Sequence, residues 1–173
     1  MEIVLEFGKL LIPALLVLYA MYLTVKSIMA KDIERKEVDF KIKNYEKILP
    51  MRLQAYERIA LLLERISPNN IMLRLNNPKL SAKEFQVILV KEIRDEFNHN
   101  LSQQIYLGED TWILVKKAIE DTINLINQCA INLKDEAKSV DLTKAVFGEI
   151  IQSEVDSVQH AISQLKKEVS QFY

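Results

Sequence analysis

One spacing in this sequence is used by metal-binding helices. Glu96 and His99 are three residues apart, which places a carboxylate and an imidazole on the same face of a helix. Di-iron bundles use this spacing, but they need a second copy of it and two further inward carboxylates. The only other histidine, His160, has Ser157 three residues before it. The metal set is incomplete, so we expect neither a metal nor another cofactor.

Neutral polar side chains gather around Leu101, whereas Lys and Glu dominate the polar faces elsewhere. On a half-buried face, amide and imidazole groups form hydrogen-bond networks. Such a network would fix the register of the helices. The alternative is a surface for a partner or a ligand. Its candidate residues are Arg74, Glu96, His99, Asn100, Gln103 and Gln104.

A second polar set surrounds the apolar stripe of the run Met51–Ile66. Charges of this kind usually form a solvated face with weak ion pairs. Arg74 follows in an apolar stretch, so we expect it to have a carboxylate partner such as Glu57 or Glu64. The candidate members of a structural polar network are Arg52, Glu57, Glu64, Asn69 and Asn70.

Most familiar catalytic and binding signatures are missing from the sequence. It contains no phosphate-binding glycine loop, nucleophile elbow or zinc-ligand spacing. The net charge of −1 gives no basic footprint for nucleic acid, and the single cysteine, Cys129, excludes a disulfide framework. We therefore expect a protein that is not an enzyme and that does not bind nucleic acid.

The element that would position everything else is the apolar stretch Leu10–Ala30. Its 21 residues reach about 31 Å as a helix, enough for a bilayer core of about 30 Å if the Lys26 ammonium reaches the headgroups. This predicts a transmembrane helix. A cleaved signal peptide and a buried core helix of a soluble protein are the alternatives.

Basic residues follow this stretch, and only Lys9 precedes it. The positive-inside rule then predicts an inner-membrane, single-pass protein whose N-terminus is outside and whose remaining chain is cytoplasmic. The predicted partners are the lipid bilayer, further copies of the chain and other membrane proteins. The basic residues after the uncharged core of this stretch, Leu10–Val25, are Lys26, Lys31, Arg35, Lys36, Lys41, Lys43 and Lys47.

The chain is predicted to have three parts: a tail and transmembrane helix (1–30), a charged juxtamembrane helix (31–49) and a cytoplasmic helical domain (50–173). Pro50 predicts a kink or a fresh helix start. Ser67–Asn70 predicts the end of the next helix. The residues from Ser67 to Leu80 would form a long connection that packs over the end of a bundle or serves a function.

Three further helices are expected. Ser81 and Glu84 form a capping box that opens one of them, which ends near Gly108. Asp110 is expected to cap the next helix.

The last helix is expected from about Asp141 to the C-terminus, with Ile151 and Val155 in its apolar seam. The predicted fold is therefore all-α, with one N-terminal transmembrane helix followed by an up-down helical bundle with coiled-coil-like seams. These seams also allow coiled coils between molecules.

Two stretches carry a resemblance to a known family. They are ILPMRLQAYERIALLLERISPNN (Ile48–Asn70) and EFNHNLSQQIY (Glu96–Tyr106). Here the sequence resembles an uncharacterised family of single-span, membrane-anchored helical proteins of Bacteroidota. The resemblance implies an inner-membrane protein with a cytoplasmic helical domain, and it implies no activity.

These features predict a non-enzymatic, membrane-anchored helical adaptor or scaffold that associates with itself or with a larger membrane assembly. One alternative is a ligand-binding or enzymatic bundle that uses the Glu96–Gln104 cluster. Another is a regulatory subunit that acts through its transmembrane helix.

Overall fold

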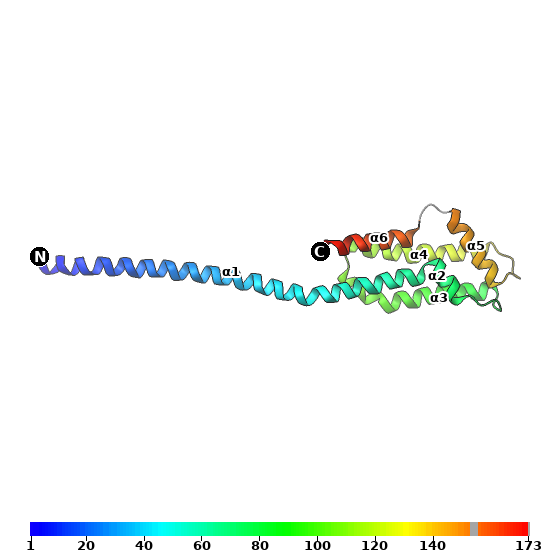
Figure 1. The fold of residues 1–173 in the computed structure, drawn as a ribbon, viewed down its shortest axis with the longest axis horizontal. Helices are drawn as coiled ribbons and strands as arrows, with labels where there is room; N and C mark the ends of the chain where they lie inside the picture. The colour runs from blue at the N-terminus through cyan, green and yellow to red at the C-terminus, as the bar shows by residue number, and fades with distance from the viewer. Residues whose placement is uncertain (153–155, 173) are drawn as a thin grey trace. The chain divides into compact units, whose positions relative to one another are not determined.

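A computed structural model shows an all-helical chain (Figure 1). It describes residues 1–152 and 156–172, and for residues 2–14 it describes the backbone alone. Among these residues, the only β-type pairing is an isolated bridge between Ser81 and Lys138. The helices are α1 (Glu2–Ile66), α2 (Pro68–Leu75), α3 (Ala82–Asn100), η1 (Leu101–Tyr106), α4 (Glu109–Ile131), α5 (Ser139–Gln152), α6 (Ser157–Val169) and η2 (Ser170–Phe172).

The chain divides into two compact units, Met1–Leu49 and Pro50–Tyr173. The first unit consists of the larger part of α1. The second contains the rest of α1 and all the other helices. Helix α1 is continuous through Pro50, so the predicted fresh helix start at this residue is wrong. A proline inside a helix removes one backbone hydrogen bond, and the helix continues here without it.

The predicted transmembrane helix is also wrong. In the described part of the chain, no helix is both long enough and apolar enough to cross a membrane. From Leu15 the uncharged run ends at Lys26, and Lys31 and Asp32 follow closely. The first residues of the predicted span, Leu10–Ala14, lie outside the residues whose side chains are described. The localisation inferred from this span stays a prediction.

The second unit is a helical bundle with one hydrophobic core. Helix α4 packs against α3 and α6, and α5 packs against α3 and α4 (Figure 1). The indole of Trp112 stacks on Phe97 at 5.7 Å between ring centroids. The fully buried side chains of this core include Ile59, Leu62, Leu63, Ile66, Phe85, Leu89, Ile93, Val115, Ile126 and Leu142.

The connection expected after Ser67 is a helix. Helix α1 ends at Ile66 as predicted, and Pro68 then occupies the first turn of α2, where a proline costs no hydrogen bond. Ile71 and Met72 of α2 are fully buried in the core. The apolar insert therefore packs onto the bundle, as the first of the two interpretations predicted.

The start of α3 follows the predicted capping box. The backbone N–H of Glu84 donates to Ser81 Oγ at 3.2 Å, and the Ser81 N–H donates to Glu84 Oε2 at 2.9 Å. The predicted cap of the next helix is wrong, because the N-cap of α4 is Gly108 and not Asp110. Asp110 instead lies in the first turn, where a negative charge is favourable to the helix dipole.

The single C-terminal helix expected from Asp141 is wrong. The structure has two helices there, α5 and α6, and Val155 lies in the stretch 153–155 that is outside the described residues. Asp156 opens α6, because its carboxylate accepts from the N–H groups of Val158 and Gln159 at 3.0 Å each. Ile151, expected in the apolar seam, is 84% exposed.

The packing of α2 leads to a testable prediction. Ile71→Ala should lower the free energy of unfolding of the second unit by about 2–5 kcal/mol, because it leaves a cavity at a fully buried position. Urea unfolding followed by the fluorescence of Trp112, the only tryptophan, measures this value. Leu73→Ala is the matched control: Leu73 is 72% exposed, so we expect a change below about 0.5 kcal/mol. Equal effects of the two variants would contradict the packing of α2.

Candidate functional site

The structure does not join Glu96 and His99 in a ligand set. His99 is exposed, while Glu96 Oε2 lies 3.2 Å from Arg65 Nη2 of α1. Among the described residues, no group of three or more His, Cys, Asp or Glu side chains could hold a metal ion.

Glu96 belongs instead to a hydrogen-bonded network between α1 and α3. The side-chain amide of Asn100 donates to the Glu96 backbone carbonyl at 2.9 Å and to Glu96 Oε1 at 3.3 Å. Asn100 is buried and the Glu96 side chain is only 15% exposed. Glu96 and Asn100 thus bind to each other and to the bundle. Arg65 completes the network, and it was not among the candidate residues predicted from the sequence.

The other residues of the predicted partner or ligand surface lie apart from this network. Gln104 is exposed, and the half-buried Gln103 donates to its neighbour Ser102 at 3.3 Å. Arg74, in α2, pairs with Glu92 of α3 at 2.8 Å. The expected pairing of Arg74 with Glu57 or Glu64 is therefore wrong.

Arg52, predicted as part of a structural network, is the centre of a cluster at one end of the bundle. Its Nη2 donates to the Tyr56 hydroxyl at 3.1 Å, and its Nε donates to the Tyr106 carbonyl at 3.3 Å. Its guanidinium carbon lies 4.4 Å from the centroid of the Phe172 ring, which is cation–π geometry. Arg52 thereby connects α1 with η1 and with the C-terminal turn η2.

Glu168 of α6 completes this cluster. Its Oε1 accepts from the Tyr56 hydroxyl at 2.6 Å and from the Gly108 N–H at 2.7 Å, and it lies 3.9 Å from Arg52 Nη2. A Cβ atom on residue 108 would lie 3.0 Å from the same oxygen, so the absence of a side chain at Gly108 makes room for the carboxylate. We call Arg52, Tyr56, Gly108 and Glu168 the Glu168 cluster.

The electrostatics of the Glu168 cluster favour an ionised Glu168 and a neutral Tyr56. Burial and the hydrogen bond to Glu168 raise the pKa of Tyr56 to about 12. Burial alone would raise the pKa of Glu168, but Thr111, Tyr56, the Gly108 N–H and the charge of Arg52 together hold it below 4.5. Glu168 Oε2 is buried and has no hydrogen-bond partner of good geometry. The Thr111 hydroxyl therefore lowers the pKa of Glu168 without a well-aligned hydrogen bond to this oxygen.

The remaining residues of the predicted structural network lie at other places in the second unit. Glu64, Asn69 and Asn70 line a polar cavity of about 680 Å³ between α1, α2, α4 and the α5–α6 region, where the Asn70 amide donates to the Glu64 carbonyl at 2.8 Å. The described lining also contains carboxylates and no Lys, Arg or His, so it would favour a cation over an anion. Those further carboxylates are Asp121, Glu149 and Asp156.

Glu57 lies on the rim of an apolar groove of about 380 Å³ between α1 and α6, which we call the α1–α6 groove. Lys166 lies on its α6 side. The structure therefore distributes the predicted network over the Glu168 cluster, the polar cavity and this groove. The groove is lined by Leu53, Tyr56, Glu57, Ala60, Leu165, Lys166, Val169 and Ser170.

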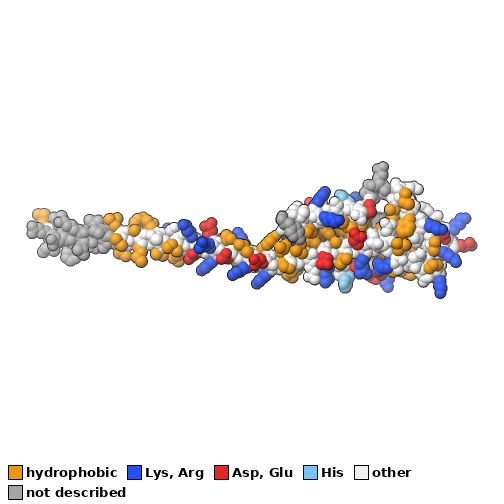
Figure 2. Space-filling view, viewed as in Figure 1, with side chains coloured by type: hydrophobic (Ala, Val, Ile, Leu, Met, Phe, Trp, Pro, Cys, Tyr) orange, Lys and Arg blue, Asp and Glu red, His pale blue; other side chains and the backbone are white. Residues whose placement is uncertain are grey.

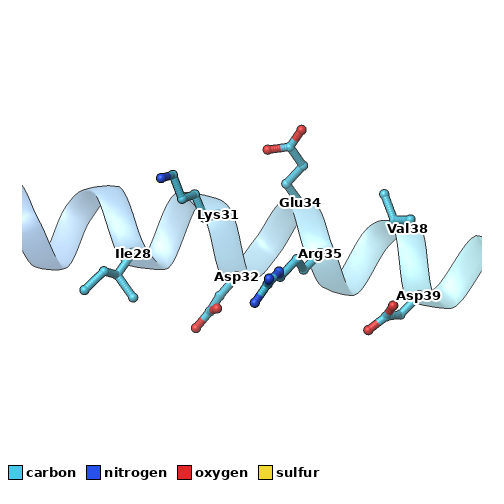
Figure 3. Close-up of a pocket in the computed structure, with 7 residues that line it drawn as sticks. All are labelled: Ile28, Lys31, Asp32, Glu34, Arg35, Val38 and Asp39. Atoms are coloured by element: carbon cyan, nitrogen blue, oxygen red, sulfur yellow. The ribbon is translucent and has the colours of Figure 1, made fainter.

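The first unit presents a helix with uncovered apolar side chains (Figure 2). From Leu15 to Val25 the large hydrophobic side chains are between 46% and 67% exposed. Further along, Figure 3 shows Ile28, Lys31, Asp32, Glu34, Arg35, Val38 and Asp39 projecting from one helix on different sides. The space that they border is open helix surface, and within the first unit no second described element lies opposite.

The Glu168 cluster makes a prediction about pH. The pKa of Glu168 is lowered in the folded state, so its stabilising contribution is complete above the unfolded value of 4.5 and is lost as the pH falls through the folded pKa. Glu168→Gln should therefore lower the free energy of unfolding by about 1.5–3 kcal/mol at neutral pH, because it removes charge-assisted hydrogen bonds. The deficit should shrink at about pH 3.

Urea unfolding of both proteins at the two pH values tests this prediction. Glu120→Gln, at an exposed position of α4, removes the same charge away from the cluster and should have little effect at either pH. A deficit for Glu168→Gln that stays constant with pH would show that the carboxylate is not stabilised as its contacts indicate.

No curated protein and no solved structure matches the chain. One family model does match, and it covers residues 2–172, which is nearly the whole sequence. Its description is "Family of unknown function (DUF7935)". The chain therefore belongs to DUF7935, a family of unknown function. This member of the family is all-helical in the part of the chain that the structure describes.

Proposed function

We propose that this protein is a non-enzymatic helical scaffold that assembles with further copies of itself through the α1 helix of its first unit. Family membership carries no activity with it. The origin in Bacteroidota, implied by the resemblance, stays a prediction.

One observation carries the proposal: the apolar side chains of the first unit are uncovered. Leu16, Val17, Leu18 and Tyr19 are consecutive and each is about three-fifths exposed or more, at 64%, 67%, 62% and 62%. Consecutive helical residues point in different directions around the axis. A helix that is apolar on all sides needs cover on all sides. A single partner helix covers one side, so we expect more than two copies to pack around this segment.

The helix keeps an apolar stripe beyond this segment. Val38, Ile42 and Tyr45 are separated by four and three residues, and each is about half exposed, at 50%, 51% and 50%. This is the spacing with which helices pack in coiled coils. Charged residues lie between these positions and keep the rest of the helix surface polar.

The contacts of the second unit support a structural role for two half-buried acids. Glu96 and Glu168 are the acids at the two networks described above, and each is bound to groups from neighbouring helices. The alternative prediction was a ligand-binding or enzymatic bundle whose site is the Glu96–Gln104 cluster. Two members of that cluster, Glu96 and Asn100, are hydrogen-bonded to each other.

Sedimentation velocity of the purified full chain tests the proposal. Leu18→Glu together with Tyr22→Glu should convert the assembly to a species of lower mass, because two charges would be buried in the interface. The matched control is Ile131→Glu with Ile151→Glu, which makes the same changes at side chains of the second unit that are 79% and 84% exposed. The control should keep the mass of the unmodified chain.

Two results would contradict self-assembly. One is a full chain that stays monomeric at every concentration. The other is an unchanged mass in the Leu18→Glu/Tyr22→Glu protein. Flotation with phosphatidylcholine vesicles in place of self-association would assign the uncovered side chains to lipid instead.

A further inference from the structure

We infer that the α1–α6 groove of the second unit binds the same groove of a second copy of this chain, about a two-fold axis parallel to the two helices. This interface is separate from the one proposed for the first unit. The observation behind it is a self-complementary arrangement of charge around an apolar floor.

The floor of the groove is apolar and incompletely covered. Tyr56 and Leu165 are buried, whereas Leu53, Ala60 and Val169 are half-buried. The small side chain of Ala60 lets another helix approach closely. The open volume of about 380 Å³ leaves room for side chains from outside.

The rims carry opposite charges. Glu57, on the α1 side, and Lys166, on the α6 side, are both exposed. Within the described part of the chain, the ion pairs are Arg52–Glu168, Arg65–Glu96 and Arg74–Glu92, so neither rim residue has an ion-pair partner there. Both charges are therefore available to a second molecule.

The helices on either side of the groove run in opposite directions. Arg52, near the start of the second unit, contacts Glu168 near the end of α6. Glu64 lies two residues before the end of α1, and it lines the same cavity as Ser157, the first residue of α6. The groove therefore runs along two antiparallel helices, of which α1 contributes one acidic lining residue, Glu57, and α6 one basic lining residue, Lys166.

This arrangement selects one symmetry. A two-fold axis parallel to the helices exchanges the walls, so Glu57 of each copy faces Lys166 of the partner subunit. A two-fold axis across the helices would place each wall against its own copy and bring like charges together, which is unfavourable. The charges thus favour the parallel axis.

The expected strength is modest. Exposed ion pairs contribute at most about 1 kcal/mol each, so they set the orientation. Burial of Leu53, Ala60 and Val169 supplies the main attraction. A contact of this size belongs to the weak, reversible class, so we expect a dimer that dissociates on dilution.

Charge exchange between two different copies tests the inference. The experiment uses the full chain carrying Leu18→Glu and Tyr22→Glu, so that association through the first unit is removed and read separately. In this background, Glu57→Lys gives a copy with two basic rims, and Lys166→Glu gives a copy with two acidic rims. Each alone should associate at least about tenfold more weakly than the background protein, because like charges meet.

Mixing the two single variants should restore association, since a copy with basic rims meets a copy with acidic rims. Sedimentation velocity of the mixture, with one copy fluorescently labelled, measures the mixed dimer. Arg58→Glu is the control, because Arg58 is exposed on α1 but does not line the groove. It should associate like the background protein.

Three results would overturn the inference. The first is a mixture that associates no better than its components. The second is self-association of the background protein that is absent, or that neither Glu57→Lys nor Lys166→Glu reduces. In that case the groove would have a different occupant. The third is a change in the urea midpoint of the single variants with no change in association, because this would mean that the two charges act within one chain.

Discussion

The carboxylate of Glu168, on a side chain that is 13% exposed, is the group on which the closure of the bundle depends. Its Oε1 is shared by the Tyr56 hydroxyl of α1 and the Gly108 N–H at the start of α4, while Glu168 itself lies on α6. A buried charge is unfavourable unless it is paired and hydrogen-bonded. The carboxylate therefore holds three segments in the one arrangement that satisfies it, and the hydrophobic core fills the space between them.

The two units differ in how far their apolar side chains are covered. In the second unit the apolar faces of α1, α3, α4 and α6 cover one another, and side chains such as Ile59 and Phe85 are fully buried. In the first unit the large apolar side chains of one helix, from Leu15 to Val25, are left uncovered. Water opposes such exposure. Self-assembly is therefore proposed for the first unit and, in the second unit, for the incompletely covered α1–α6 groove.

Local rules predicted the features that depend on neighbours in sequence. The all-helical class, the end of α1 at Ile66 and the capping box of Ser81 and Glu84 each follow from a few adjacent residues. Local rules failed where a distant contact or a competing local one decided the outcome. Gly108 is the N-cap of α4 and its N–H donates to the distant Glu168, while Asp156 caps a new helix inside an apparently continuous seam. The transmembrane prediction failed because the described run is interrupted by Lys26, Lys31 and Asp32.

The candidate site was predictable only in part. Sequence reasoning singled out Arg52 and Glu96, but it found none of the partners in the Glu168 cluster. Tyr56 and Glu168 are 112 positions apart, and no periodicity or motif connects residues at that distance.

The same separation affects the order of events during synthesis. Tyr56 leaves the ribosome long before α6 exists, so its hydroxyl and the apolar face of α1 must wait for more than a hundred further residues before the bundle can close. During that interval the nascent chain exposes apolar side chains of α1 that are not yet fully covered. Closure of this contact is thereby coupled to the synthesis of α6, and the interval before it is the period in which a holding chaperone would be of most use.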